Sequence, residues 1–156
     1  MEGEKLTDAA ARLLRLLDDR TLVDAVLGDH PANDRMTAPR EAFLVHGCGL
    51  LAETLVLLGG GAPVLLSCGG EPLHAAVRHA GGYLDADGWS DEATLRARWA
   101  AIVASDPAAI RVEPYGAAGE GWFRAADPEL DARIEQLADE LIRRDPALVG
   151  ALRAAI

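Results

Sequence analysis

The chain has 156 residues, of which 50% are apolar and 26% are charged, and its formal net charge is −10. This length and composition predict one globular domain, 1–156, with a core large enough to fold without disulfides or a structural metal. The acidity argues against nucleic acid as a partner, because phosphate backbones are bound by clustered Lys and Arg, and Lys5 is the only lysine. It also disfavours binding to an anionic membrane surface.

Several features predict a cytoplasmic protein. The first ten residues lack a basic segment followed by an apolar one, so no secretory signal is expected. The longest apolar run, 50–58, is too short to span a bilayer and contains Glu53. Cys48 and Cys68 do not make a disulfide framework, and reduced thiols in a cytoplasm are the simplest interpretation. The Ala- and Arg-rich composition suggests a GC-rich bacterial genome, and the oligomeric state stays open.

The first half of the chain is predicted to be helical. Apolar residues at helical spacing predict a helix over 5–18 and a shorter one over 20–27 that stops at Gly28. The turn-rich stretch 28–39 is interpreted as a surface loop or a flap over a site. The segment GCGLLAETLVLLGGG is apolar almost all round, which predicts a central buried helix ended by its glycines.

A small sheet is predicted to follow. PVLLS has the pattern of a buried strand, and LHAAVRHA and YLDAD are predicted to form a hairpin with Gly81-Gly82 as its two-residue turn. IRVEP predicts a further strand. The Gly- and Ala-rich stretch YGAAGEGWFRAA is interpreted as a loop.

The remaining elements are predicted to be helices, which makes the fold class α+β. Ser90, with the acidic residues after it, begins a helix whose apolar stripe is Leu95, Trp99, Ile102 and Val103. Asp127-Pro128 and Asp145-Pro146 predict the N-termini of two closing helices. The first of these carries one apolar face, formed by Leu130, Ile134, Leu137 and Leu141.

The residue that most suggests chemistry is Cys48, at the predicted N-terminus of the buried helix. Helix N-termini offer unpaired N–H groups and a partial positive charge, which favour a thiolate over a thiol. The same N–H groups can stabilise an oxyanion formed when the thiolate attacks a carbonyl. Gly47 and Gly49 flank the cysteine and let a substrate approach the backbone closely.

A nucleophilic cysteine needs an imidazole, and the imidazole needs an orienting carboxylate. With Gly81-Gly82 as the turn, Ala76 pairs with Asp87, and alternation along the strands places His74 on the same face as Asp85 and Asp87. In this register His74 lies diagonal to Asp87, with Asp85 one step further along. A slip by one residue would reverse the faces.

Cysteine in GCGLLAETL, histidine in LHAAVRH and aspartate in GYLDADG follow one another in an order that resembles the papain-like and transglutaminase-like cysteine superfamily. The resemblance covers about 45–90. It implies a central helix carrying Cys48 packed on a small antiparallel sheet, with flanking N- and C-terminal helices. It further implies Cys48 as nucleophile, His74 as general base and Asp85 as orienter, with Asp87 as the geometric rival.

Such a protein is a hydrolase or an acyl/amide transferase that acts through a thioester on an amide or ester, and it needs no cofactor or metal. Papain-type peptidases carry a glutamine before the cysteine, whereas the only glutamine here is Gln136, so a general endopeptidase is not expected. The rival hypothesis, from a different class, is a non-catalytic acidic binding or immunity-type protein on a similar scaffold.

Other residues near the predicted site have more than one interpretation. His46 is a candidate for lining the site and replacing the missing oxyanion donor, and Trp89 or Trp122 for a substrate wall or plain packing. A metal site from His46, Cys48, Cys68 and His74 lacks the C-x-x-C spacing typical of zinc. Cys68 is interpreted as a packing residue.

Overall fold

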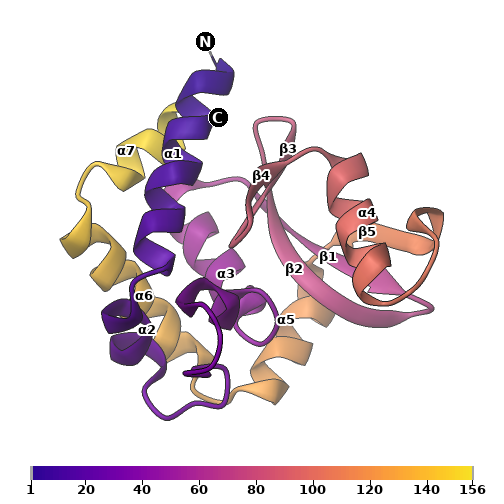
Figure 1. Ribbon diagram of the computed structural model, residues 1–156, viewed down its shortest axis with the longest axis horizontal. Helices are drawn as coiled ribbons and strands as arrows, with labels where there is room; N and C mark the ends of the chain where they lie inside the picture. Colours follow the sequence, from indigo (N-terminus) through magenta and orange to yellow (C-terminus); the bar gives the residue numbers. More distant parts are fainter. Residues whose placement is uncertain (1, 156) are drawn as a thin grey trace.

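The structure of the chain is a computed structural model that describes the backbone of residues 2–155 and the side chains of 8–117 and 119–155 (Figure 1). The helices are α1 (Glu2–Leu17), α2 (Arg20–Leu27), α3 (Cys48–Gly59), α4 (Glu92–Ile102), α5 (Gly116–Ala126), α6 (Leu130–Arg144) and α7 (Leu148–Ala154). The strands are β1 (Ala62–Cys68), β2 (Glu71–His79), β3 (Gly82–Asp85), β4 (Gly88–Ser90) and β5 (Ile110–Pro114). Short 3-10 helices, η1 (Pro39–Phe43) and η2 (Pro107–Ala109), precede α3 and β5.

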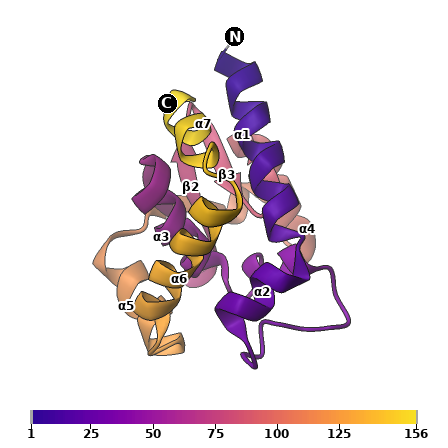
Figure 2. The same ribbon diagram turned by 90° about the vertical axis from the view of Figure 1, so that its left-hand side faces the viewer.

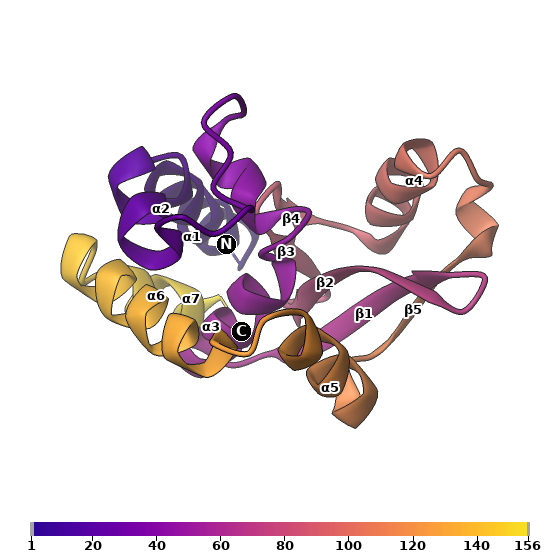
Figure 3. The same ribbon diagram turned by 90° about the horizontal axis from the view of Figure 1, so that it is seen from below.

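The strands form one antiparallel sheet in the order β4-β3-β2-β1-β5. Helices α4 and α5 lie on opposite sides of it, and the other helices gather at one end (Figure 3). Helices α1 and α7, from the two ends of the chain, lie side by side (Figure 2). The predicted α+β class is thus confirmed. None of the helices within residues 2–155 combines the length and apolarity that a membrane span requires.

Each face of the sheet has its own apolar core, because successive side chains along a strand point to opposite faces. Leu65, Ala75 and Val77 join the larger core, to which α1, α2, α3, α6 and α7 contribute. Val64 and Leu66 belong to the smaller core under α4. The sheet therefore lies between the central helix α3 and α4, and its strands pack against helices on both faces.

Helix α3 is the central buried helix that its composition predicts. Its glycines allow close packing. A Cβ on Gly49 would lie 2.5 Å from the Phe123 ring, and one on Gly59 would lie 2.7 Å from Leu152. At the N-cap, a Cβ on Gly47 would lie 2.4 Å from the carbonyl oxygen of Ala42. The glycines on both sides of Cys48 thus bring α5 and η1 against the first turn of the helix.

The predicted hairpin turn was wrong by one position. The turn is Ala80-Gly81, with positive φ at both residues (51° and 80°), and His79 pairs with Gly82. Two residues with φ > 0 form the tight turn that matches the twist of the strands. Gly82 is instead required inside strand β3, where the Trp89 ring lies 2.3 Å from the position of a Cβ. The resulting register is two residues away from the predicted one.

The stretch 116–126 was predicted to be a loop but forms α5. Glycine disfavours a helix by about 1 kcal/mol per residue, which is why its composition was misleading. Contacts from outside the segment compensate. Arg124 on α5 makes two hydrogen bonds to Glu53 of α3, at 2.9 and 3.1 Å, and Tyr115 donates a third to Glu53 at 3.0 Å. Together with Phe123 against Gly49, they fix α5 to the central helix.

Two helix predictions need smaller corrections. In α4, Leu95 and Trp99 are buried as expected, but Ile102 and Val103 are exposed because the helix ends there. The predicted apolar face of α6 is confirmed, yet α6 and α7 begin two residues after the two Asp-Pro prolines. The aspartate side chains still accept hydrogen bonds from the backbone that leads into each helix.

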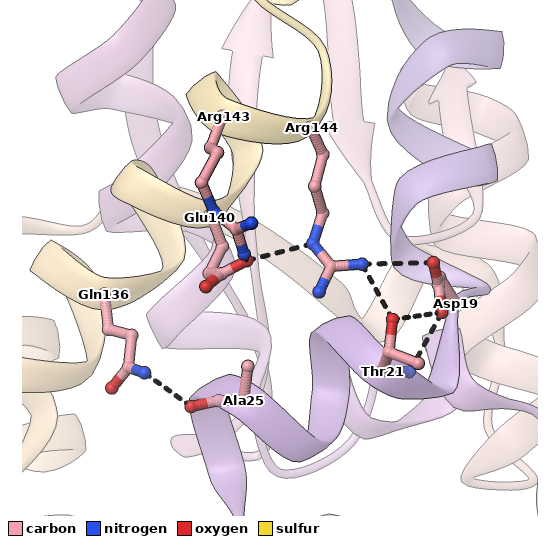
Figure 4. A network of polar contacts seen from close by, with 7 residues as sticks. All are labelled: Asp19, Thr21, Ala25, Gln136, Glu140, Arg143 and Arg144. Carbon is pink, nitrogen blue, oxygen red and sulfur yellow. Dashed lines mark hydrogen bonds and ion pairs between the residues drawn. The ribbon is translucent and has the colours of Figure 1, made fainter.

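Polar contacts attach α6 to α2 (Figure 4). Arg144 donates to Asp19 at 3.1 Å and to Thr21 at 2.8 Å, and Gln136 donates to the carbonyl oxygen of Ala25 at 2.6 Å. The single glutamine of the chain therefore takes part in helix packing, and its amide is engaged outside the polar cluster around Cys48.

Candidate active site

Cys48 is the first residue of α3, and its side chain is buried with 2% exposure. Its sulfur lies 3.9 Å from the carbonyl oxygen of Val45, a weak contact. Among the described residues no side chain caps this helix, so its first-turn N–H groups are available to an anion. The thiol therefore lies where the helix dipole and the N–H groups both favour negative charge.

His74 and Asp85 form a buried hydrogen-bonded pair. His74 Nε2 lies 2.8 Å from Asp85 Oδ2, and the side chains are 0% and 3% exposed. The second carboxylate oxygen, Oδ1, accepts the backbone N–H of Asp87 at 2.8 Å. The carboxylate is thus held at both oxygens, and it fixes the plane of the imidazole.

The other ring nitrogen of His74, Nδ1, lies 3.1 Å from the carbonyl oxygen of Leu44. Since both nitrogens face acceptors, the imidazolium is the state that satisfies both contacts. Burial lowers the pKa of His74, but hydrogen bonding and charge interactions with Asp85 and with the neighbouring Cys48 side chain outweigh it and raise the pKa to about 9. The predicted cysteine, histidine and aspartate thus lie together in one cluster.

The hairpin register decides which aspartate reaches the histidine. Val77 pairs with Leu84, so Asp85 stands opposite Ala76 and diagonal to His74. A shift of two residues keeps every side chain on its predicted face, but it moves Asp85 into the position expected for Asp87. Of the two candidates, Asp85 is therefore the one bonded to the imidazole.

Asp87 has a different partner. The guanidinium of Arg98, on α4, lies 3.4 Å from Asp87 and 3.9 Å from Asp85, between the two carboxylates. Its Nη1 is buried and makes no hydrogen bond within the described residues, so it acts there as a positive charge. Nothing in the sequence pattern singles out Arg98.

Trp99, the next residue of α4, covers the imidazole. Its ring is stacked on His74 with a centroid distance of 4.4 Å and an interplanar angle of 23°. The apolar stripe of α4 identified Trp99 as a core residue, but not as the one that shields the His74–Asp85 pair from water. Helix α4 therefore supplies both the positive charge of Arg98 and the aromatic ring that covers His74.

Replacing Arg98 with methionine is expected to lower the free energy of unfolding by about 1–2 kcal/mol, because Asp85 and Asp87 would lose the cation between them. Urea titration at pH 7 measures this loss. Arg111→Met is the matched control, since Arg111 is exposed and, among the residues that the structure describes, pairs with Glu113 alone, at 3.6 Å. Equal stability of the two variants would contradict the role of Arg98.

The other predicted site residues lie at different places. His46 is exposed and lines a surface pocket of about 130 Å³ with Gly47. Trp89 packs over Gly82 and donates to the carbonyl oxygen of His79 at 3.0 Å, so it supports the hairpin instead of joining the cluster. The tryptophan beside the helix N-terminus is Trp122, on α5.

The four residues considered for a metal site are not gathered together. Cys68 contacts Ser105, with 3.8 Å between its sulfur and the hydroxyl oxygen. Within the part of the chain that the structure describes, no group of three or more His, Cys, Asp or Glu side chains is arranged to hold a metal ion.

Comparison of the chain with protein-family models, with curated proteins and with solved structures found no match. What the cluster can do chemically follows from its side chains: a cysteine at a helix N-terminus, an imidazole beside it, and a carboxylate that orients the imidazole.

Proposed function

We propose that the chain is a cysteine-dependent hydrolase or acyl/amide transferase with a papain-like or transglutaminase-like Cys–His–Asp site. Cys48 is the nucleophile, His74 the general acid and base, and Asp85 the orienter. The observation that carries this proposal is the buried 2.8 Å hydrogen bond between His74 and Asp85, formed beside a cysteine at the N-terminus of the central helix. The arrangement fits the activation of a nucleophile by an oriented base.

The reaction follows from the positions of these groups. The thiolate of Cys48 attacks the carbonyl carbon of an amide or ester, and first-turn N–H groups of α3 stabilise the oxyanion. The C–N or C–O bond then breaks as Nδ1 of His74 gives its proton to the leaving amine or alcohol. Water, or an amine acceptor, then gives a proton to His74 and attacks the carbonyl carbon of the thioester. The C–S bond breaks, the product leaves, and the thiolate of Cys48 is regenerated.

The hydrogen bond between the Leu44 carbonyl oxygen and His74 must break during this cycle. In the structure this oxygen lies 3.1 Å from Nδ1 of His74, which is the atom that transfers the proton. The leaving group would replace it as the hydrogen-bonding partner. Residues 44–47 connect η1 to α3, so a change in this connection would withdraw the Leu44 carbonyl from Nδ1.

The resemblance in chain order supports the same proposal, with the nucleophile on a central helix and its partners on adjacent strands. A binding or immunity-type protein is the second candidate. The observation in its favour is the burial of the cluster, because Cys48 and His74 are 2% and 0% exposed. A purely structural Cys–His–Asp cluster has no need of access.

Alkylation by iodoacetamide separates the two candidates, with mass spectrometry measuring the rate at each cysteine. Cys48 is expected to be labelled rapidly already at pH 6.5, because the imidazolium stabilises its thiolate. His74→Ala is expected to slow this labelling about tenfold or more. Cys68 is the internal reference, since its described polar partner is Ser105, and its rate is expected to be the same in both proteins.

Two results would contradict catalysis. One is labelling of Cys48 only after the chain is unfolded by urea, and the other is an unchanged rate in His74→Ala. The first would make Cys48 a packing residue, the second would show that His74 does not activate it, and both favour the binding protein. Circular dichroism of His74→Ala establishes that the variant is folded before the rates are compared.

A further inference from the structure

A pocket of about 130 Å³ lies at the first turn of α3. Gly47 and Leu50 form the wall on the side of Cys48. Trp122 and Phe123 of α5 form a second wall, and Leu27 and Leu130 close the pocket from α2 and α6. Elements far apart in the sequence thus meet next to the cysteine.

The pocket is apolar, although it opens at the surface. Trp122 is 45% exposed and Val45 is 62% exposed, and both line it. Large exposed apolar side chains that gather around a concavity mark a binding site more often than a plain surface. An apolar group that enters here would cover them.

The polar side chains at the rim are His30, His46 and Asp127, and His46 is exposed. Burial and the neighbouring Arg133 lower the pKa of His30, which is neutral at pH 7 and accepts the backbone N–H of Ala32 at 3.0 Å. Asp127 is paired with Arg133 at 3.0 Å. A charged group that enters among the apolar walls formed by Leu27, Leu50 and Leu130 would lose its hydration there, which favours a neutral occupant.

We infer that this pocket receives the apolar acyl side of the amide or ester that Cys48 attacks. The inference rests on the function proposed above and adds the substrate class. The volume is about tenfold the smallest space that holds one water molecule, so a small branched alkyl group fits. The side chain of a leucine residue, next to the scissile carbonyl, is such a group.

The pocket lies next to the first turn of α3, where the proposed nucleophile is located. Gly47 directly precedes Cys48, and Leu50 lies two residues after it in the same turn of α3. A carbonyl group attached to an occupant of the pocket would then lie next to the first turn of α3, whose N–H groups stabilise the oxyanion in the proposed reaction.

Binding can be measured without catalysis in a Cys48→Ser chain. N-acetyl-leucinamide is expected to bind at least about tenfold more tightly than N-acetyl-glycinamide, with NMR shift changes at the indole of Trp122. Ala126→Phe fills the pocket and is expected to weaken leucinamide binding about tenfold. Ala125→Phe is the matched control, because Ala125 is also exposed on α5 but does not line the pocket.

The outcomes distinguish the two proposals. Equal binding of the two amides, or equal effects of the two phenylalanine variants, would overturn the subsite. Slow labelling of Cys48 by iodoacetamide, together with selective leucinamide binding, would overturn catalysis and leave a binding pocket. N-isobutyl-iodoacetamide provides the joint test. It is expected to label wild-type Cys48 faster than N-methyl-iodoacetamide does, and Ala126→Phe is expected to abolish the difference.

Discussion

Replacing Asp85 with alanine is expected to lower the free energy of unfolding at pH 7 by about 3–5 kcal/mol, the typical cost of removing one partner of a buried ion pair. The physical reason is the burial of both groups. The imidazolium of His74 is completely covered, and its Nε2 has Asp85 as its partner at 2.8 Å. Without the carboxylate, His74 must either stay charged without a counter-ion or lose its proton. Urea unfolding followed by circular dichroism measures the loss.

Two further variants test the cause. Asp85→Asn keeps an acceptor for Nε2 but removes the charge, so a smaller loss of about 1–2 kcal/mol is expected. The double variant His74→Phe/Asp85→Leu replaces both polar groups and is expected to be more stable than Asp85→Ala. If Asp85→Ala lost less than 1 kcal/mol, about the net value of an ordinary hydrogen bond, the pair would not be a buried ion pair.

The stability of the chain is expected to fall between pH 6.5 and pH 9 through His74. The folded state raises the pKa of this residue from 6.5 to about 9, so below pH 6.5 both states hold the proton and the full stabilisation is present. Between the two values only the folded state keeps the proton, and rising pH favours unfolding. At about 1.4 kcal/mol per pKa unit, the loss is on the order of 3 kcal/mol.

This pH dependence is measured best in a Cys48→Ala chain, which removes the other ionisable side chain next to His74. The loss is then smaller, since Cys48 is one of the groups that raise the pKa of His74. Adding His74→Phe is expected to remove the dependence. Burial lowers the pKa of His30 and of His79, so their contribution has the opposite sign: near pH 6.5 it raises stability as the pH rises, and it is the same in both chains. Parallel curves for the two chains would contradict a protonated His74.

Much of the site could be predicted because its positions depend on local rules. A nearly uniform apolar segment bounded by glycines predicts the buried helix and so the place of Cys48. The alternation of side chains places His74 and both aspartates on one face, and this holds for any even shift of register. The predicted register favoured Asp87 and the resemblance favoured Asp85, since the choice depends on whether the turn uses Gly81-Gly82 or Ala80-Gly81.

The elements that complete the site could not be predicted from local patterns. Helix α5 contains three glycines, which disfavour a helix, and it is held in place because Arg124 reaches Glu53, 71 positions away in the sequence. Trp99 and Arg98 contact the cluster only because α4 packs on the far face of the sheet. Contacts of this range come from tertiary packing, which propensity does not encode.

Trp89 has a consequence for the cluster that it does not touch. Its ring covers Gly82, and its Nε1–H donates to the carbonyl oxygen of His79, the residue paired with Gly82. These contacts fasten the two strands at the turn, and so they set the distance from the turn at which a carboxylate meets the histidine. The position of the turn sets the register of β2 and β3, and this register determines whether Asp85 or Asp87 lies next to His74. Trp89 stabilises the turn in its observed position. The identity of the acid beside His74 is thus decided at the opposite end of the strand.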